Sequence, residues 1–392
     1  MEIIWIWAGI LLVVVTLVDT FFTVLNYNEP GLITNRVVVQ EWRFIRFVTS
    51  RLNGHVRRFV YRQMTGVMLT SVILVWLAGL ILGFSFIYMG ALQSGALTHD
   101  QGAPPGYWGA LYYSMGQFST VGSTHFSPET TWVNMLSVIE TLLSIVLLSM
   151  VITFLSNVYS SIQALRTLCA SFPAPGSKVG SPVDTLAPYF PSQDTWSLEI
   201  HLVAVRGNFN TYFDSLAQDH SSLVFQSGKD QFSMPFGVYM TAGTLEVLRF
   251  GLPEQHVARS LAELERLHYS FAGCQEELYG LLRWDLPEAA TPMEEAEFWR
   301  EWKSASAGEC GGDFSVVRFH RLRQVTADLA QISPDYGEED LYRTYCRWLE
   351  AITQYDDFIS RSSRYLGYRP ATSGGRFPLI DPIDKYGWLI TK

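Results

Sequence analysis

The sequence predicts an all-α membrane protein with three membrane-spanning helices, a short re-entrant helix followed by a non-helical loop, and a mainly helical C-terminal domain. Two observations lead to this fold class. Three apolar segments, 3–25, 65–89 and 132–159, are each long enough to cross a bilayer, because a helix that rises about 1.5 Å per residue needs roughly 20 residues to do so. Between the second and third segments lies a shorter stretch, 107–128, in which aromatic, helix-compatible residues give way to small and β-branched ones.

The charged residues divide the chain near residue 163. Up to that position there are seven basic and seven acidic residues, whereas the remainder has 21 basic and 30 acidic residues, so the net charge of −9 belongs to the C-terminal part. We expect four parts: a peripheral helix with an amphipathic linker at 1–63, a membrane core at 64–163, a linker at 164–195 and a cytosolic, mainly helical domain at 196–392. The acidic balance of the last part argues against nucleic acid as a partner.

The first apolar segment, 3–25, is predicted to be an anchored helix. A signal peptide is the alternative, but the segment has neither a basic region before it nor a small-residue cleavage site. Asp19 lies inside this segment. An acid in an apolar span is costly unless it faces protein, water or a cation, and one of the arginines that follow the segment is the expected partner of Asp19.

The arginines also predict the orientation of the chain. Every basic residue before Arg166 lies between Arg36 and Arg62, and the positive-inside rule places that loop in the cytoplasm. The N-terminus then lies outside the inner (plasma) membrane and the C-terminal part is cytosolic. The loop mixes arginine with aromatic and aliphatic residues, which is typical of an amphipathic helix that contacts membrane lipid. A voltage-sensing helix is the alternative, but only Arg43 and Arg46 are in register.

The stretch 107–128 is too short to span a membrane. It passes into Thr120, Val121 and Gly122, small or branched residues that suit an extended strand better than a helix. Non-helical backbone at membrane depth is tolerated only where protein buries it or where it lines a water-filled path. A re-entrant loop that lines such a path satisfies this requirement.

The order of a helix, a short helix, a T-V-G strand, a loop with Ser-Pro and a second helix resembles the pore module of the tetrameric potassium-channel superfamily. Residues 120–128 are also similar to the prokaryotic non-selective sodium/potassium channel, and residues 19–25 to the first helix of a bacterial family often labelled two-pore-domain potassium channels. The resemblance implies a homotetrameric cation channel in which four filter strands direct backbone carbonyls, and the hydroxyl of Thr120, at K⁺ or Na⁺. Segments 64–163 would then form the pore domain.

The predicted filter departs from the family pattern T-V-G-Y-G-D after its first three residues. Ser123, Thr124 and His125 stand where the family has tyrosine, glycine and aspartate. A β-branched residue in place of the second glycine penalises the backbone conformation used there, so the outer half of the filter is expected to differ in shape. The choice between potassium and sodium therefore stays open. A non-conducting signalling or scaffold protein built on a degenerate pore is the alternative function.

Four residues are expected to support the filter. In the family, aromatic residues of the short helix brace the filter, which implies this role for Trp108, Tyr112 and Tyr113; anchoring at the membrane interface is the alternative. Glu140, the one ionisable residue of the third segment, is expected either behind the filter, bonded to the short helix, or near the cavity.

The third segment, 132–159, is predicted to line the pore. It would run beyond about 40 Å and project toward the cytosol, and it has no glycine to act as a hinge. Thr153, Ser156 and Asn157 are spaced for one helical face, so we expect them to line the inner mouth.

The C-terminal part has no motif for catalysis, nucleotide binding or metal binding in its sequence. We therefore expect no enzymatic activity and no cofactor besides the permeating ion. Apolar residues at helical spacing predict helices at 255–284, 293–304, 314–332 and 338–366, and 184–205 is expected to hold a little strand. This domain would gate or assemble the channel, and a cytosolic ligand or protein partner stays open.

Overall fold

The computed structural model describes residues 2–25, 31–49, 51, 54–100, 102, 104–122, 125–172, 182–190, 196–218, 223, 232–307, 313–332, 338–366, 368–370 and 389–391. Most of these residues are helical, which confirms the all-α class. The chain divides into two units. The first comprises Met1–Arg51, Gln63–Ser161 and Leu216–Phe225, and the second comprises Leu52–Arg62, Ile162–Ser215 and Gln226–Lys392.

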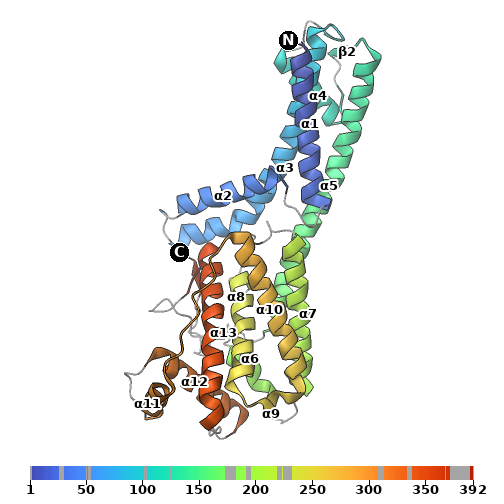
Figure 1. The fold of residues 1–392 in the computed structure, drawn as a ribbon. Helices are drawn as coiled ribbons and strands as arrows, with labels where there is room; N and C mark the ends of the chain where they lie inside the picture. The colour runs from blue at the N-terminus through green and yellow to red at the C-terminus, as the bar shows by residue number, and fades with distance from the viewer. Residues whose placement is uncertain are drawn as a thin grey trace. The chain divides into compact units, whose positions relative to one another are not determined.

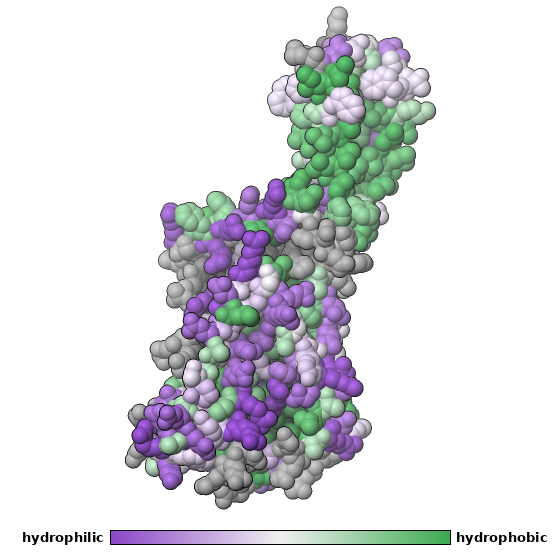
Figure 2. All heavy atoms as spheres, viewed as in Figure 1, coloured by the Kyte–Doolittle hydropathy of each residue, from purple (hydrophilic) through white to green (hydrophobic). Residues whose placement is uncertain are grey.

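Among the described residues, three helices are long and apolar enough to cross a membrane. They are α1 (Glu2–Leu25), the portion Gln63–Gln93 of α3 (Gly54–Gln93), and α5 (Thr131–Ala170). The three predicted spans are therefore confirmed as helices of sufficient length and hydropathy, and α3 and α5 continue beyond their apolar segments. Figure 1 shows α1, α3 and α5 side by side, and Figure 2 shows the hydrophobic side chains that cover their surface.

Small residues allow α1 and α3 to pack closely. A Cβ atom placed on Gly9 would lie 2.5 Å from the carbonyl oxygen of Gly83, and one on Gly79 would lie 2.4 Å from Oγ1 of Thr16. Helix association within a membrane depends on such close packing, because lipid tails are as apolar as the side chains. α1 is thereby fixed along the membrane-spanning part of α3.

Asp19 of α1 holds the start of α2 (Thr34–Thr49), which runs across the axis of α1 in Figure 1. Its carboxyl oxygens accept hydrogen bonds from the backbone N–H of Ile33 at 2.6 Å and of Thr34 at 3.2 Å. They also accept from the hydroxyl of Thr34 at 2.6 Å and from the indole N–H of Trp76 at 3.1 Å. No arginine is among the partners of Asp19 in the described residues, and the side chains of Arg57, Arg58 and Arg62 lie outside them. A helix N-terminus offers unpaired N–H groups and a positive dipole end, which satisfy a buried acid equally well.

α4 (Tyr107–Phe118) lies between two short strands, β1 (Leu97–His99) and β2 (Phe126–Pro128). The strands pair antiparallel, with Thr98 opposite Ser127. Three-residue strands are too short to produce an alternating pattern, so the sequence analysis did not predict this sheet. The sheet ties the chain before α4 to the chain after it, and so holds the intervening helix and loop at both ends.

The second unit is built around α8 (Met234–Glu246), in which every residue is buried. α6 (Pro182–Leu186), α10 (Leu261–Leu282) and α13 (Glu338–Tyr365) pack against it, as Figure 1 shows. The sequence pattern does not predict α8. A helix buried on all sides has no polar face, so its apolar residues show no helical period.

The other predicted helices of this unit are largely confirmed. α11 (Glu295–Ser306), α12 (Phe314–Ala330) and α13 match three of them closely. The fourth is divided into α9 (Glu254–Val257), the 3₁₀ turn Ala258–Ser260 and α10. A second two-stranded sheet pairs β3 (Tyr368–Pro370) with β4 (Leu389–Thr391).

The described residues of 184–205 contain no strand, and residues 191–195 lie outside the described residues. The described residues there belong to α6, to the 3₁₀ turn Ala187–Tyr189 and to the start of α7 (Trp196–Gln218). The buried residues of α7 recur every three or four positions, which is the period of a helix. These are Leu198, Leu202, Val205, Phe209, Tyr212 and Leu216.

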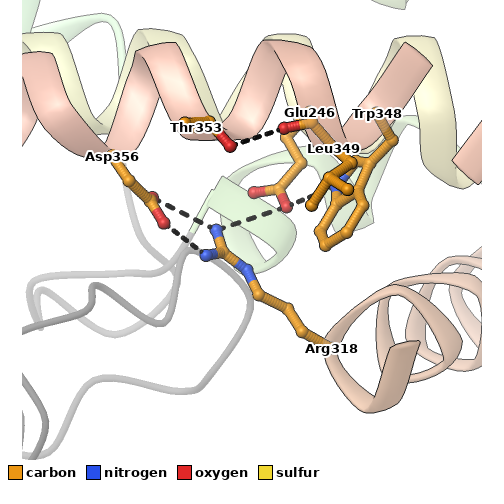
Figure 3. A network of polar contacts seen from close by, with 6 residues as sticks. All are labelled: Glu246, Arg318, Trp348, Leu349, Thr353 and Asp356. Carbon is orange, nitrogen blue, oxygen red and sulfur yellow. Dashed lines mark hydrogen bonds and ion pairs between the residues drawn. The ribbon is translucent and has the colours of Figure 1, made fainter. Parts of the chain in front are cut away.

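A buried network of charges joins three helices of this unit (Figure 3). The guanidinium of Arg318 (α12) donates to Asp356 (α13) at 2.6 Å and to Glu246 (α8) at 3.4 Å. The indole N–H of Trp348 donates to the same oxygen of Glu246 at 3.0 Å, whereas the other oxygen, Oε2, is buried and accepts no hydrogen bond from the described residues. Burial raises the pKa of Glu246 to about 7, although Arg318 acts in the opposite direction.

Glu246→Gln is expected to remove a pH dependence from the stability of the second unit. Because its pKa is raised, Glu246 binds a proton more tightly in the folded unit than in the unfolded chain. Its favourable contribution to the free energy of unfolding is therefore largest below the ordinary pKa of 4.5 and is lost as the pH rises through about 7. The measurement is thermal unfolding of the full chain at a series of pH values, compared between variant and wild type.

The comparison with wild type is needed because other buried groups titrate in the opposite sense. Burial lowers the pKa of His201, His268 and His320, so each of them costs stability as the pH falls. Glu297→Gln, on the exposed face of α11, serves as the control and should keep the wild-type pH profile. An identical profile in Glu246→Gln and wild type would contradict the prediction.

Candidate functional site

α4 ends where the predicted filter begins. The N–H of Thr120 donates to the carbonyl of Gln117 at 3.1 Å, and the N–H of Gly122 donates to the carbonyl of Gly116 at 3.1 Å. Both filter residues have left-handed backbone, with φ of 61° at Thr120 and 78° at Gly122. The chain therefore turns back over the end of α4. The expectation of an extended strand is wrong for 120–122, because these bonds satisfy the last carbonyls of the helix.

The turn places strain on Thr120. Left-handed backbone is uncommon for any residue other than glycine, and for a β-branched side chain it costs roughly 1–2 kcal/mol. Residues held in such conformations cluster at functional sites. The neighbouring Val121 is 85% exposed, so its side chain has no place in the core of one chain. Ser123 and Thr124, the outer part of the predicted filter, lie outside the described residues.

Glu140 connects three helices behind this turn. Its side chain is fully buried, and its carboxyl oxygens accept hydrogen bonds from the hydroxyl of Ser114 on α4 at 2.6 Å and from the hydroxyl of Tyr88 on α3 at 2.7 Å. The sequence left two positions open for Glu140, one bonded to the short helix and one near the cavity. In the structure Glu140 is bonded to the short helix, α4. A donor on each oxygen compensates for removing this polar group from water.

Tyr113 makes the second link between α4 and α5. Its hydroxyl lies 2.8 Å from Oγ of Ser137, which itself donates to a backbone carbonyl of α5, so Tyr113 is the donor in this pair. Its ring meets the ring of Tyr88 edge-on, with centroids 4.8 Å apart, and lies 5.5 Å from that of Phe126 in β2. Tyr113 therefore fixes α4 to both neighbouring helices and to the sheet.

Three members of this network were not predicted from the sequence. Hydroxyl residues are common in membrane helices, so the sequence pattern does not single out Ser114, Tyr88 or Ser137. A signal was present for Ser137, which lies three residues before Glu140 and so shares its helical face.

The other two predicted filter supports on α4, Trp108 and Tyr112, take no part in this hydrogen-bond network. Trp108 is 69% exposed and Tyr112 is 46% exposed. Neither makes a hydrogen bond that the structure shows within the described chain, so of the three predicted filter supports on α4 only Tyr113 is seen to hydrogen-bond to α5. A cavity of about 370 Å³ also lies beside Tyr113, between α4 and α5, and its lining includes Gln117 and Thr141.

α5 buries only one narrow stripe. Of its most apolar window, 22% is buried, against 39% for the span in α3. Thr153, Ser156 and Asn157 are all exposed. Ser149 and Ser160, at spacings of four residues from Thr153 and Ser156, extend this polar face. Exposed hydroxyl and amide groups on a membrane helix indicate contact with water or protein rather than with lipid.

Residues 66–161 match the model of a protein family described as ion channel. The match begins in α3, includes α4 and the turn that follows it, and ends in α5. Searches of curated proteins and of solved structures found no match to the chain.

Proposed function

We propose that the chain conducts cations, either potassium alone or potassium and sodium, as a homotetramer, because residues 66–161 match an ion-channel family and three helices are long and apolar enough to cross a membrane. The observation that carries this proposal is the end of α4. The dipole of α4 gives this terminus a partial negative charge, and the terminus meets a non-helical turn on a helix that Glu140 and Tyr113 hold in place. A cation held there is stabilised without any charged side chain in the path.

One such turn per chain cannot surround an ion, so several copies have to meet on an axis. The exposed surface of α5, with its polar face at Thr153, Ser156 and Asn157, supports such an assembly, because the polar groups would then line a water-filled inner mouth. Trp108 and Tyr112 are exposed on α4 and are available to the neighbouring copy. In this arrangement they would brace the filter between chains rather than within one.

Thr120, Val121 and Gly122, followed by Ser123 and Thr124, would form the cation path. The N-terminus would lie outside the inner membrane and the second unit in the cytosol, as the arginines of the loop 36–62 suggest. The second unit would assemble the pore or control its opening. Its buried core around α8 makes it a folded body able to transmit a force to α5.

The test is ion flux through the purified full chain in liposomes. We expect a potassium flux that empty liposomes do not show, and the ratio of potassium to sodium flux gives the selectivity. Absence of both fluxes from a protein that assembles correctly would overturn the channel and favour the alternative, a non-conducting scaffold. The departure of the filter from the family pattern at Ser123 and Thr124 is the observation behind that alternative.

Thr120→Gly is expected to stabilise the fold slightly while impairing conduction. Glycine adopts φ near 61° freely, which relieves roughly 1 kcal/mol of strain, but the change removes the hydroxyl proposed to contact the cation. Thr120→Ser keeps the hydroxyl and is the matched control. The measurements are the melting temperature in detergent and potassium flux, and a flux in Thr120→Gly equal to that in wild type would remove Thr120 from the ion path.

A further inference from the structure

α2 presents an exposed face on which arginine and phenylalanine alternate. Phe44 is 66% exposed and Phe47 is 59% exposed, and the guanidinium of Arg51 lies over the ring of Phe47, 4.6 Å from its centre. Arg43 and Arg36 are exposed on the same side, at spacings of four and eleven residues before Phe47. An apolar ring flanked by cations suits the boundary between lipid tails and headgroups.

The charge of this face is uncompensated among the described residues. None of the ion pairs that the structure shows involves Arg36, Arg43 or Arg46. Arg46 lies roughly 100° around the helix from Phe47, on the side of Arg43, whereas the only acid of α2, Glu41, lies roughly 120° away in the opposite direction. The face therefore complements a negatively charged partner.

The Asp19 bonds fix the depth of this face. Asp19 lies 17 residues after Glu2, or about 26 Å along α1, close to the full thickness of about 30 Å of the hydrocarbon. Since Asp19 binds the backbone of Ile33 and Thr34, α2 begins at that level and runs across the axis of α1 (Figure 1). A helix in this position lies along the boundary of the inner leaflet.

We propose that the exposed arginine–phenylalanine face of α2 binds phosphate-bearing lipids of the inner leaflet, and that the Asp19 bonds link this lipid-bound helix to the inner end of α5. The phenylalanine rings enter the outer part of the hydrocarbon. The guanidinium groups of Arg36, Arg43 and Arg46 bind headgroup phosphates.

A continuous set of contacts forms the link. Thr34, at the start of α2, accepts a hydrogen bond from the indole N–H of Trp76 at 2.9 Å, and that N–H also reaches Asp19. The ring of Trp76 then meets the ring of Phe154 of α5 edge-on, with centroids 5.2 Å apart. Trp76 and Phe154 are both buried, and Phe154 adjoins Thr153 of the proposed inner mouth. A displacement of α2 thus reaches α5 through packed side chains.

The lipid part is tested without any measurement of conduction. The full chain, purified in an uncharged detergent, is incubated with phosphatidylglycerol or with phosphatidylcholine, and bound lipids are counted by native mass spectrometry. We expect the preference for phosphatidylglycerol to fall at least about tenfold when Arg36→Gln, Arg43→Gln and Arg46→Gln are combined. The same three positions changed to lysine should keep the preference, because the charge is retained.

A matched control removes three exposed arginines from the second unit, with Arg259→Gln, Arg266→Gln and Arg300→Gln combined. The control should bind lipid as wild type does. An unchanged preference in the α2 variant, an equal loss in the control, or displacement of phosphatidylglycerol by an equal concentration of inorganic phosphate would each overturn the lipid face.

The link to α5 rests on the proposed channel function and has a separate readout. We expect potassium flux of the wild type to change with the phosphatidylglycerol content of the liposomes, and Asp19→Asn to lose this dependence while it still binds the lipid. A lipid dependence retained by Asp19→Asn would overturn the link. Absence of flux from wild type in every membrane would overturn the proposed channel function. The number of bound lipids measured by mass spectrometry would still decide whether α2 binds lipid.

Discussion

Replacing Glu140 by alanine is expected to destabilise the membrane unit by about 3 kcal/mol or more and to abolish potassium flux. The change leaves the hydroxyl groups of Ser114 and Tyr88 without their buried acceptor, and each hydrogen bond to a carboxyl group contributes about 1.5–3 kcal/mol. It also opens a cavity at the point where α3, α4 and α5 meet. α4 would no longer be held at a fixed angle, so the turn at 120–122 would lose its support.

Thermal unfolding of the full chain in detergent measures the first effect, and flux in liposomes measures the second. Glu140→Gln retains the volume and one acceptor oxygen, so its loss of stability should be about half as large. Glu129→Ala is the matched control, because Glu129 is exposed and accepts only an exposed hydrogen bond from Thr98. Should Glu140→Ala melt and conduct like Glu129→Ala, the support assigned to Glu140 does not exist.

Arg318→Met is expected to destabilise the second unit by about 3–5 kcal/mol, because it leaves Glu246 buried without its cationic partner. Methionine fills a similar volume, so the effect comes from charge rather than from packing. Without Arg318 the pKa of Glu246 should rise further, since the guanidinium is the largest influence that lowers it. The defect of Arg318→Met should therefore shrink as the pH falls and Glu246 takes up a proton.

Unfolding of the second unit, followed by circular dichroism of the full chain, measures this change. The double variant Glu246→Gln, Arg318→Met removes both partners and should recover part of the lost stability. Arg300→Met, on the exposed face of α11, should leave the melting temperature unchanged. The charge pair would not be the cause if the loss of stability in Arg318→Met did not depend on pH. The same conclusion would follow if the double variant lost as much stability as Arg318→Met.

The membrane spans were predictable because lipid imposes a simple requirement. About twenty apolar residues in a row have few alternatives to a spanning helix, so α1 and the spans in α3 and α5 were evident from composition. The helix ends were not, since a helix can continue past the hydrocarbon wherever its backbone bonds remain satisfied. α8 could not be predicted because it is buried on every side. It therefore has no polar face, and its sequence shows no amphipathic period.

The residues of the site were predicted better than their partners. Glu140 and Tyr113 were expected near the filter, but their partners are distant in the sequence. Tyr88, which donates to Glu140, lies 52 residues before it, and Ser137, which bonds to Tyr113, lies 24 residues after it. The same holds for Asp19. The free-energy cost of an acid inside an apolar helix predicted a partner for Asp19. An arginine and a helix N-terminus both offer positive charge to an acid, so the partner depends on the tertiary structure.

The sequence by itself determined that this chain has three helices long and apolar enough to cross a membrane, a short helix followed by a T-V-G segment, and an acidic helical C-terminal part. Hydropathy and charge are properties of single residues and their neighbours, so a linear pattern records them. Only the tertiary structure decided that Thr120 turns over the end of α4 with left-handed backbone, that Glu140 binds Ser114 and Tyr88, and that Asp19 caps α2. Hydrogen bonds between distant residues depend on which helices pack together, and no local pattern encodes that choice.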